Sequence, residues 1–381
     1  MALRWCDSCG DYYDYTQLID VWNVVEPAGI ADQSLTRNIH GISVIVGAGR
    51  CGGDAIGYIA LVNLVDPQND GLWKTLDDRS TWIVAWAYKP ANPVSNARRP
   101  LLVLQSRNAA NPQVSVNIEA NGKLSVYRGS TLVGGFVLLG TSTFALQGGN
   151  WYQIQFKVTI HNSTGSFELK VNGTTILSAS GIDTQNLAGS TADTFKFSGI
   201  IASSTGIAST PDLIDDIVII DDQAALGTEN GRVVDFPGDV QVLEPIFPNA
   251  NGALQDFTPN AGVNHFDRID EFPPDEDTTY LEGSILNNQD SNEYENISTA
   301  FSIVGLQINS RVNKQQAGER TFKNLIRESV GPTIQLFNDT HFPSVLDYIY
   351  YCGPSDKNPF TGLQYTPAEI NALQYGLKIT V

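Results

Sequence analysis

Aspartates near the middle of the chain are the first residues whose types and spacing could support chemistry. Asp215 and Asp216 are adjacent, and Asp221 and Asp222 follow a short apolar run. Ca²⁺ is bound by about six to eight oxygen atoms, and a loop at the rim of a sheet can supply several of them. These four aspartates are therefore calcium candidates, as is the acidic run 267–277. The alternative, which we favour, is a solvated acidic edge that discourages unwanted strand pairing and binds no cofactor.

The aspartates do not match the pattern of a glycosidase. A retaining enzyme needs two carboxylates about 5 Å apart, and an alternating strand supplies such a pair from residues i and i+2 or i+4. Asp215 and Asp216 are neighbours that would point to opposite faces, and Asp212 has the wrong spacing. No Gly-x-Ser-x-Gly motif occurs, and the four histidines are scattered. We therefore expect no catalytic residues, no metal centre formed by histidines and no enzymatic activity.

Three tryptophans are candidates for carbohydrate binding, which needs only exposed aromatic rings and a few polar groups. They are Trp82, Trp86 and Trp151. Side chains alternate along a strand, so Trp82 and Trp86 lie on the same side of one strand. That side is either a platform for a sugar or part of the core, and we favour the core. Glycan binding stays open as an alternative function.

The elements that position these side chains are predicted to be strands. The chain has 381 residues, 42% of them hydrophobic but only 17% charged, with 34 Gly and 18 Pro. This composition favours short strands and turns over long helices. Hairpins are predicted at 114–126 and 152–171, because apolar and polar residues alternate on both sides of a turn sequence. Further strands are expected at 42–46, 81–88, 194–203 and 213–220, and together they predict an all-β, antiparallel sandwich.

The charge and the apolar runs exclude two classes of partner. The net charge of −18 repels nucleic acid, and the pair Arg98-Arg99 is expected to be a solvated loop. No apolar run reaches the roughly 20 residues that span a bilayer, so no membrane insertion is expected. The N-terminus lacks the apolar segment of a secretory signal, which favours synthesis in a cytosol.

The order of the segments predicts how the chain is divided. Residues 1–40 should be a lead-in that packs on a sandwich formed by residues 41–222. Residues 223–295 are rich in proline and acidic residues and are expected to form a loop-rich acidic arm. Residues 296–381 should add strands and a short helix of roughly 8 to 10 residues, beginning with the capping box Thr366-Pro367-Ala368-Glu369.

A series of short motifs follows in a fixed order along most of the chain. The motifs are Gly49-Arg50-Cys51-Gly52-Gly53, the strand from Trp151, Asn172-Gly173, Asp215-Asp216-Ile217, Gly238-Asp239-Val240, Asp277-Thr278-Thr279-Tyr280, Tyr365-Thr366-Pro367 and Asn371-Ala372-Leu373-Gln374-Tyr375-Gly376. In their shared order they resemble tailed-phage virion proteins that carry a laminin-G or concanavalin A-like jelly-roll domain.

The resemblance implies a non-enzymatic structural component of a virion, made in the host cytoplasm. Its place in the tail, fibre, neck or capsid decoration is left open. The implied partners are other phage structural proteins and copies of the same chain. The alternative is a protein of the phage tail that recognises a carbohydrate on the host surface.

Cysteines mark a departure from the family pattern. A zinc site would need a second pair beside Cys6 and Cys9, and none is present, so buried thiols are the preferred interpretation for all four, Cys51 and Cys352 included. Relatives often carry an aromatic residue near the positions of Cys9 and Cys51. The resemblance therefore suggests that these two thiols lie close together.

Overall fold

The structure is a computed structural model. It divides into two compact units, Met1–Glu244 and Pro245–Val381, and each is described by itself. The described residues are 3–7, 22, 42–45, 50, 55–58, 72–92, 94, 98–106, 111–129, 135–186, 189, 191–197, 212–221, 236–238, 242, 245–271, 275–299, 303–315, 318–329, 331–337, 340–345 and 348–381.

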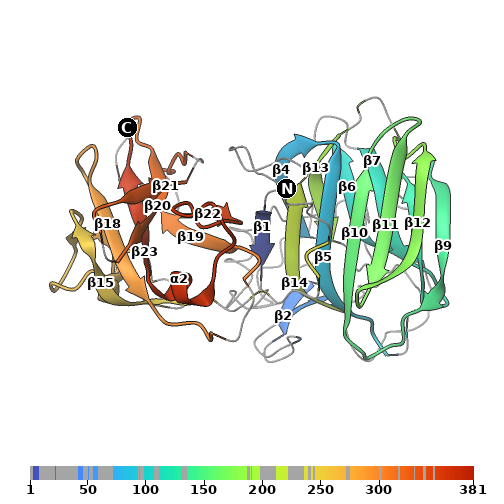
Figure 1. The fold of residues 1–381 in the computed structure, drawn as a ribbon, viewed down its shortest axis with the longest axis horizontal. Helices are drawn as coiled ribbons and strands as arrows, with labels where there is room; N and C mark the ends of the chain where they lie inside the picture. The colour runs from blue at the N-terminus through green and yellow to red at the C-terminus, as the bar shows by residue number, and fades with distance from the viewer. Residues whose placement is uncertain are drawn as a thin grey trace, which may run out of the picture. The chain divides into compact units, whose positions relative to one another are not determined.

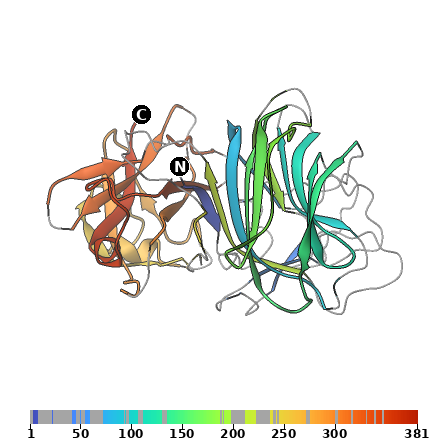
Figure 2. The same cartoon turned by 45° about the vertical axis from the view of Figure 1, so that its right-hand side comes forward.

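Two antiparallel sheets lie face to face in the described part of the first unit (Figure 1, Figure 2). The eight-stranded sheet has the order β12-β11-β10-β5-β14-β3-β2, and β1 also pairs with β14; the six-stranded sheet has the order β4-β13-β6-β7-β8-β9. The first comprises β1 (Leu3–Asp7), β2 (Ile42–Ile45), β3 (Ala55–Tyr58), β5 (Thr81–Lys89), β10 (Tyr152–Thr159), β11 (Gly165–Val171), β12 (Thr174–Ile182) and β14 (Asp212–Asp221). The second comprises β4 (Leu72–Arg79), β6 (Arg99–Ser106), β7 (Asn111–Ile118), β8 (Lys123–Arg128), β9 (Val137–Ala145) and β13 (Ala192–Phe197).

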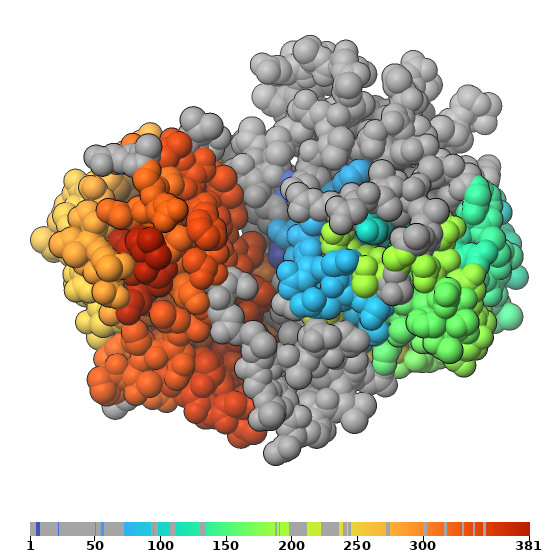
Figure 3. Space-filling model, turned by 90° about the horizontal axis from the view of Figure 1, so that it is seen from above, coloured from blue at the N-terminus to red at the C-terminus, as the bar shows by residue number. Residues whose placement is uncertain are grey.

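Segments that are far apart in sequence are neighbours in these sheets. Figure 3 shows the blue surface of the residues around β4 and β5 beside the yellow-green surface of the residues around β13. The predicted fold class, an all-β antiparallel sandwich, is confirmed. The N-terminal segment contributes a strand to this sandwich, because β1 pairs with β14 from Leu3 to Asp7.

The core of the first unit lies between the sheets and is built from alternate side chains. On β5, Trp82 and Trp86 point inward and contact aromatic rings from β13 of the opposite sheet. The ring centroids of Trp82 and Phe195 are 4.7 Å apart, and those of Trp86 and Phe197 are 5.9 Å apart. Both pairs meet edge to face, an arrangement that adds about 0.5–1.5 kcal/mol to the burial of the rings.

The two predicted hairpins are confirmed, together with their turns. β7 pairs with β8 across Asn121-Gly122, and β10 pairs with β11 in the predicted alternation. Asn172 and Gly173 then connect β11 to β12 with φ of 48° and 77°. Two positive φ values define the turn that matches the twist of a two-residue hairpin, which explains the Asn-Gly sequence.

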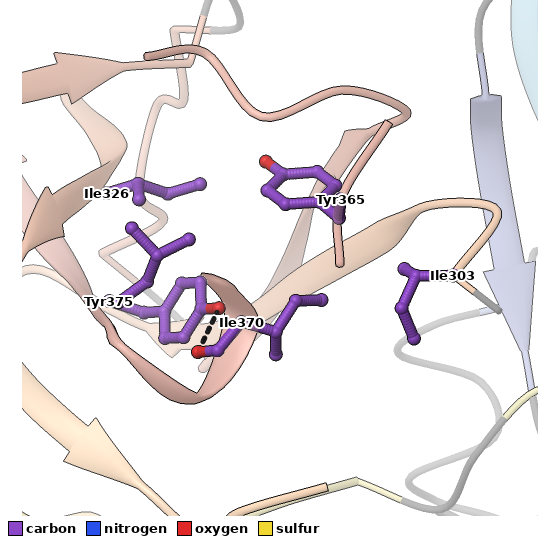
Figure 4. Packing of buried hydrophobic residues seen from close by; sticks show 6 residues of the cluster. Ile303, Ile326, Tyr365, Ile370 and Tyr375 are labelled. Atoms are coloured by element: carbon purple, nitrogen blue, oxygen red, sulfur yellow. Dashed lines mark hydrogen bonds between the residues drawn. The ribbon is translucent and has the colours of Figure 1, made fainter. Parts of the chain in front are cut away.

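The second unit has a sheet of its own, with the order β15-β18-β23-β20-β21. In its core the rings of Tyr365 and Tyr375 pack with Ile326 and Ile370, and the Tyr375 hydroxyl donates to the Ile370 carbonyl at 3.1 Å (Figure 4). The elements are β15 (Pro248–Gln255), β16 (Thr258–Pro259), η1 (Phe266–Arg268), β17 (Leu281–Glu282), β18 (Gln289–Tyr294), β19 (Leu306–Val312), β20 (Phe322–Glu328), β21 (Ile334–Leu336), β22 (Ile349–Ser355), α2 (Pro367–Asn371) and β23 (Leu373–Ile379).

The second unit differs from the predicted loop-rich arm over 223–295. β15 and β18 lie in that range and pair with each other. β18 was not predicted because its buried residues, Asp290, Ser291 and Asn292, are polar. A search for alternating apolar residues does not detect such strands.

The helix α2 begins as predicted but is shorter. Thr366 accepts a hydrogen bond from the Glu369 N–H, and the Glu369 carboxylate accepts one from the Thr366 N–H, which confirms the capping box. The helix has 5 residues rather than the roughly 8 to 10 expected. It ends early because the chain from Leu373 pairs with both β18 and β20.

Two glycines provide a test of the turns. Gly122 and Gly173 both have φ near +80°, but a Cβ on Gly122 would lie 2.5 Å from the Leu146 carbonyl oxygen, whereas a Cβ on Gly173 would meet nothing within 4 Å. Gly173→Ala should cost about 1–2 kcal/mol from backbone strain, and Gly122→Ala should cost more. The measurement is denaturant unfolding followed by tryptophan fluorescence, since all 6 tryptophans belong to the first unit. Equal costs would contradict the close approach at Gly122.

Candidate functional site

Two of the calcium candidates, Asp215 and Asp216, lie in a bulge of β14. The pairing of β14 with β5 shifts between Asp215 and Val218, and Asp216 has a φ of 52°. Asp215 accepts hydrogen bonds from the backbone N–H groups of Arg50 and Asp216, at 2.7 and 2.8 Å. Asp216 accepts one from Arg50 Nε at 2.7 Å and one from the Val242 N–H at 2.8 Å. Every carboxylate oxygen of the pair is therefore used by a protein donor.

The other acidic candidates do not add ligands to this pair. Asp221 is fully buried and accepts from Arg79 Nε at 3.3 Å, and Asp222 lies outside the described residues. Among the described residues no three Asp, Glu, His or Cys side chains come together as a metal ion would require. The Asp215–Asp216 pair acts here as an acceptor that fastens Arg50 and Val242 to the bulge.

Burial perturbs the titration of Asp215. Desolvation and the charge of neighbouring Asp216 raise the pKa of Asp215 to about 7. The folded state therefore holds this proton more tightly than the unfolded chain does.

The tryptophan candidates divide between the core and the surface. Trp82 and Trp86 are fully buried, and Trp82 Nε1 donates to the Ala192 carbonyl at 2.8 Å. They belong to the core, as the favoured interpretation of the sequence has it, and the alternative of a sugar platform is wrong for both, because neither ring reaches solvent. Trp151 is half-buried, with Lys89 Nζ 5.8 Å from its ring centroid, and it stays a glycan-binding candidate.

Arg99 also departs from the prediction of a solvated pair. Its side chain is fully buried and donates to Tyr88 at 2.8 Å and to Asp212 at 2.7 Å. Only Arg98 of the pair is exposed. Within the predicted basic loop, Arg99 therefore forms a buried ion pair and only Arg98 lies at the surface.

The outer face of the six-stranded sheet carries polar side chains that were not singled out from the sequence. On β7 the inward residues are Val114, Val116 and Ile118, and the positions between them are polar. Ser115 Oγ donates to the Gly129 carbonyl at 2.9 Å, and Asn117 Nδ2 donates to Ser115 Oγ at 3.0 Å. On the next strands Ser125 and Thr141 are within hydrogen-bond distance at 3.2 Å.

An accessible cluster lies at one end of this face and consists of Arg98, Glu119, Tyr127 and Phe136. The Tyr127 hydroxyl donates to Glu119 at 2.8 Å, and Arg98 Nε donates to the other Glu119 oxygen at 2.8 Å. The guanidinium carbon of Arg98 lies 5.1 Å from the Tyr127 ring centroid and 5.9 Å from that of Phe136. Arg98 is 41% exposed and Phe136 37%. We call this set the rim cluster.

The electrostatics of the rim cluster fix its protonation. Burial opposes ionisation of Glu119, but hydrogen bonds from Arg98, Ser125 and Tyr127 lower its pKa overall. Burial and the hydrogen bond to Glu119 raise the pKa of Tyr127 to about 12. The cluster therefore presents a fixed carboxylate, a guanidinium and a neutral phenol beside an exposed aromatic ring.

Exposed apolar side chains gather next to the rim cluster. In the described part of the first unit, the large hydrophobic residues that are exposed are Phe136, Val137, Leu138 and Phe144. They lie on β9 or immediately before it, and β9 is the last strand of its sheet. Exposed apolar side chains on an edge strand are available for contacts with another molecule.

The likeness to known proteins concerns the fold. No protein-family model matches the chain, and no curated protein matches it. Among solved structures it is similar to endo-beta-1,4-glucuronan lyase from the fungus Trichoderma reesei, with 11% identity and a TM-score of 0.38 over 52% of this chain and 90% of that one. It is also similar to the cellulose induced protein Cip1, with 14% identity and a TM-score of 0.38 over 58% and 100%.

A carbohydrate binding module, CBM66 from Bacillus subtilis, is similar at 9% identity and a TM-score of 0.28, over 48% of this chain and 96% of that one. At such identities the likeness is one of fold alone.

None of the described helices is long and apolar enough to cross a membrane.

The raised pKa of Asp215 predicts how stability changes with pH. A carboxyl group whose pKa is higher in the folded state stabilises the protein most at low pH, and that contribution is lost as the pH rises from about 4 to about 7. The free energy of unfolding of the first unit should therefore fall across this range, and Asp215→Asn should make the fall smaller. Urea unfolding followed by tryptophan fluorescence measures it.

Asp77→Asn is the matched control, because Asp77 is an exposed residue of β4. It should leave the pH dependence close to that of the wild type. A wild-type stability that rises between pH 4 and 7 and is unaffected by Asp215→Asn would contradict the assignment.

Proposed function

We propose that the first unit is a non-enzymatic carbohydrate-binding module whose contact site is the rim cluster. The observation that carries the proposal is the exposed Phe136 ring beside Arg98 and Glu119, which hydrogen bonds hold in fixed positions. An aromatic ring can pack against the apolar face of a sugar, while a guanidinium and a carboxylate can bind its hydroxyl groups. Preformed polar groups of this kind lose little side-chain freedom on binding.

The protonation of the rim cluster supports a binding role over catalysis. A general base works best when its pKa lies near the working pH. The pKa of Tyr127 is raised to about 12, and its proton is held by Glu119. Glu119 is shifted in the opposite direction and is a carboxylate at neutral pH. Neither group is set up to exchange a proton with a substrate.

Binding to a panel of polysaccharides tests the proposal. Phe136→Ser and Arg98→Ala should each weaken binding at least about tenfold, because each removes a direct contact. Phe144→Ser is the matched control, since Phe144 is 40% exposed and lies on β9, outside the rim cluster. Isothermal titration calorimetry gives the affinities, and a reducing-sugar assay should detect no cleavage.

Two outcomes contradict this function. One is equal affinity of the wild type and both rim variants for every polysaccharide bound. The other is release of reducing or unsaturated ends by the wild type, which would make the protein an enzyme.

A second proposal is that the protein is a structural subunit of a bacteriophage particle and acts through protein contacts. The exposed apolar residues Val137 and Leu138 on the edge strand β9 favour such contacts. The phage assignment itself rests on the resemblance of the sequence motifs. Recognition of a host-surface carbohydrate by a phage tail would unite the two proposals.

Self-association tests the second proposal. The chain should form a defined oligomer by light scattering, and Leu138→Asp should shift it towards monomer, because a charge would be buried at the contact. Leu363→Asp is the control, because Leu363 is exposed in the second unit. A monomeric wild type at all concentrations, with this chain absent from images of assembled particles, would overturn it.

A further inference from the structure

Two glutamines on the outer face of the eight-stranded sheet are buried without hydrogen-bond partners. β10 alternates, so Ile154 and Phe156 point into the core while Gln153 and Gln155 point outward. Each glutamine is only 1% exposed. Within the described part of the chain, neither the amide nitrogen nor the amide oxygen of either side chain has a hydrogen-bond partner.

Such a pair requires an explanation, because buried polar groups in folded proteins are almost always hydrogen-bonded. A single unpaired atom can reflect local geometry, but here two complete amides two residues apart lack partners. An amide that the protein leaves unpaired is available to a ligand that restores the missing bonds. The two side chains therefore have hydrogen-bonding capacity that the described residues do not use.

The surroundings of the glutamines define the chemistry of this site. On β5 the residues opposite Gln153 and Gln155 are Ala87 and Ala85, which carry no polar atoms. On β11 the residue opposite Gln155 is Lys170, whose Nζ lies 3.9 Å from the Phe236 ring centroid and 3.6 Å from Glu168. The neighbouring cation thus has its own partners, and the strip presents neutral amides.

Asp215 on β14 is opposite Ala87, and both of its oxygens accept from the backbone N–H groups of Arg50 and Asp216. The hydrogen-bonding capacity of this carboxyl group is therefore used within the protein. A ligand for this strip should be uncharged and should both donate and accept hydrogen bonds.

We propose that Gln153 and Gln155 form a subsite for a neutral sugar residue, which we call the glutamine strip. Each amide both donates and accepts, as does each sugar hydroxyl group. Side chains at i and i+2 on a strand are about 6.5–7 Å apart, so the two amides can bind hydroxyl groups on opposite sides of one sugar ring. This inference rests on the proposed carbohydrate-binding function and adds a second site on the other sheet.

Replacement of each glutamine by methionine tests the strip, because methionine has a similar shape but no hydrogen-bonding groups. Without sugar, Gln153→Met and Gln155→Met should each raise the Tm by a few degrees, since the variant no longer buries unpaired amide atoms. With a panel of neutral oligosaccharides in isothermal titration calorimetry, both variants should bind at least about tenfold more weakly than the wild type.

Lys157→Met is the matched control. Lys157 follows on the same face of β10 but is only partly buried. Lys157→Met should therefore neither weaken sugar binding nor raise the Tm as the two glutamine variants do. A fall in Tm for both glutamine variants without sugar would show that the amides are satisfied inside the protein, and it would overturn the inference.

The two sites fail in different ways. If Phe136→Ser removes all binding and both glutamine variants bind like the wild type, the glutamine strip is refuted and the rim cluster stands. If the glutamine variants lose binding and Phe136→Ser does not, the glutamine strip stands and the rim cluster is refuted. If the wild type binds no saccharide, both are refuted.

Discussion

The contact between the two sheets of the first unit is the interaction on which the rest of the structure depends. Trp82 and Trp86 from one sheet meet Phe195 and Phe197 from the other, and these rings fill the interior. Because side chains alternate along a strand, placing these apolar residues inside directs their neighbours outward. The outer faces then carry the polar groups that can bind something. The core therefore determines which side chains face outward and can bind a ligand, although the core residues themselves do not bind it.

Polar groups on the outer faces follow two different patterns. In the rim cluster, Tyr127 and Arg98 both donate to Glu119. Arg98 and Glu119 are partly open to solvent, whereas Tyr127 is buried. On the opposite sheet, Gln153 and Gln155 are buried and lack partners within the described residues. The first pattern is a preorganised surface, in which little has to move when a ligand binds. In the second pattern, buried amide groups without hydrogen bonds lower the stability of the fold, as residues at functional sites often do.

The sequence predicted the structure correctly where a local pattern and burial indicate the same element. It failed where the pairing of distant strands determines which residues meet. Alternation and turn residues predict the hairpin at Asn121-Gly122, the turn at Asn172-Gly173 and the inner strand from Thr81 to Lys89.

The rim cluster does not follow from local patterns, because Arg98 and Glu119 are 21 residues apart and meet only through strand pairing. The bulge at Asp216 requires a positive φ, and the presence of an aspartate in the sequence does not predict one. β18 was missed because its buried side chains are polar. Cys9 and Cys51, with their predicted proximity, lie outside the described residues.

We propose that carbohydrate binds to the outer surface of the first unit, and not to its core or to the second unit. Hydrogen–deuterium exchange of the full chain, with and without a bound polysaccharide, distinguishes these regions. We expect slower exchange in peptides that contain Glu119, Tyr127 and Phe136, with no change across Pro245–Val381. Protection confined to the second unit, or no protection at saturating polysaccharide, would contradict it.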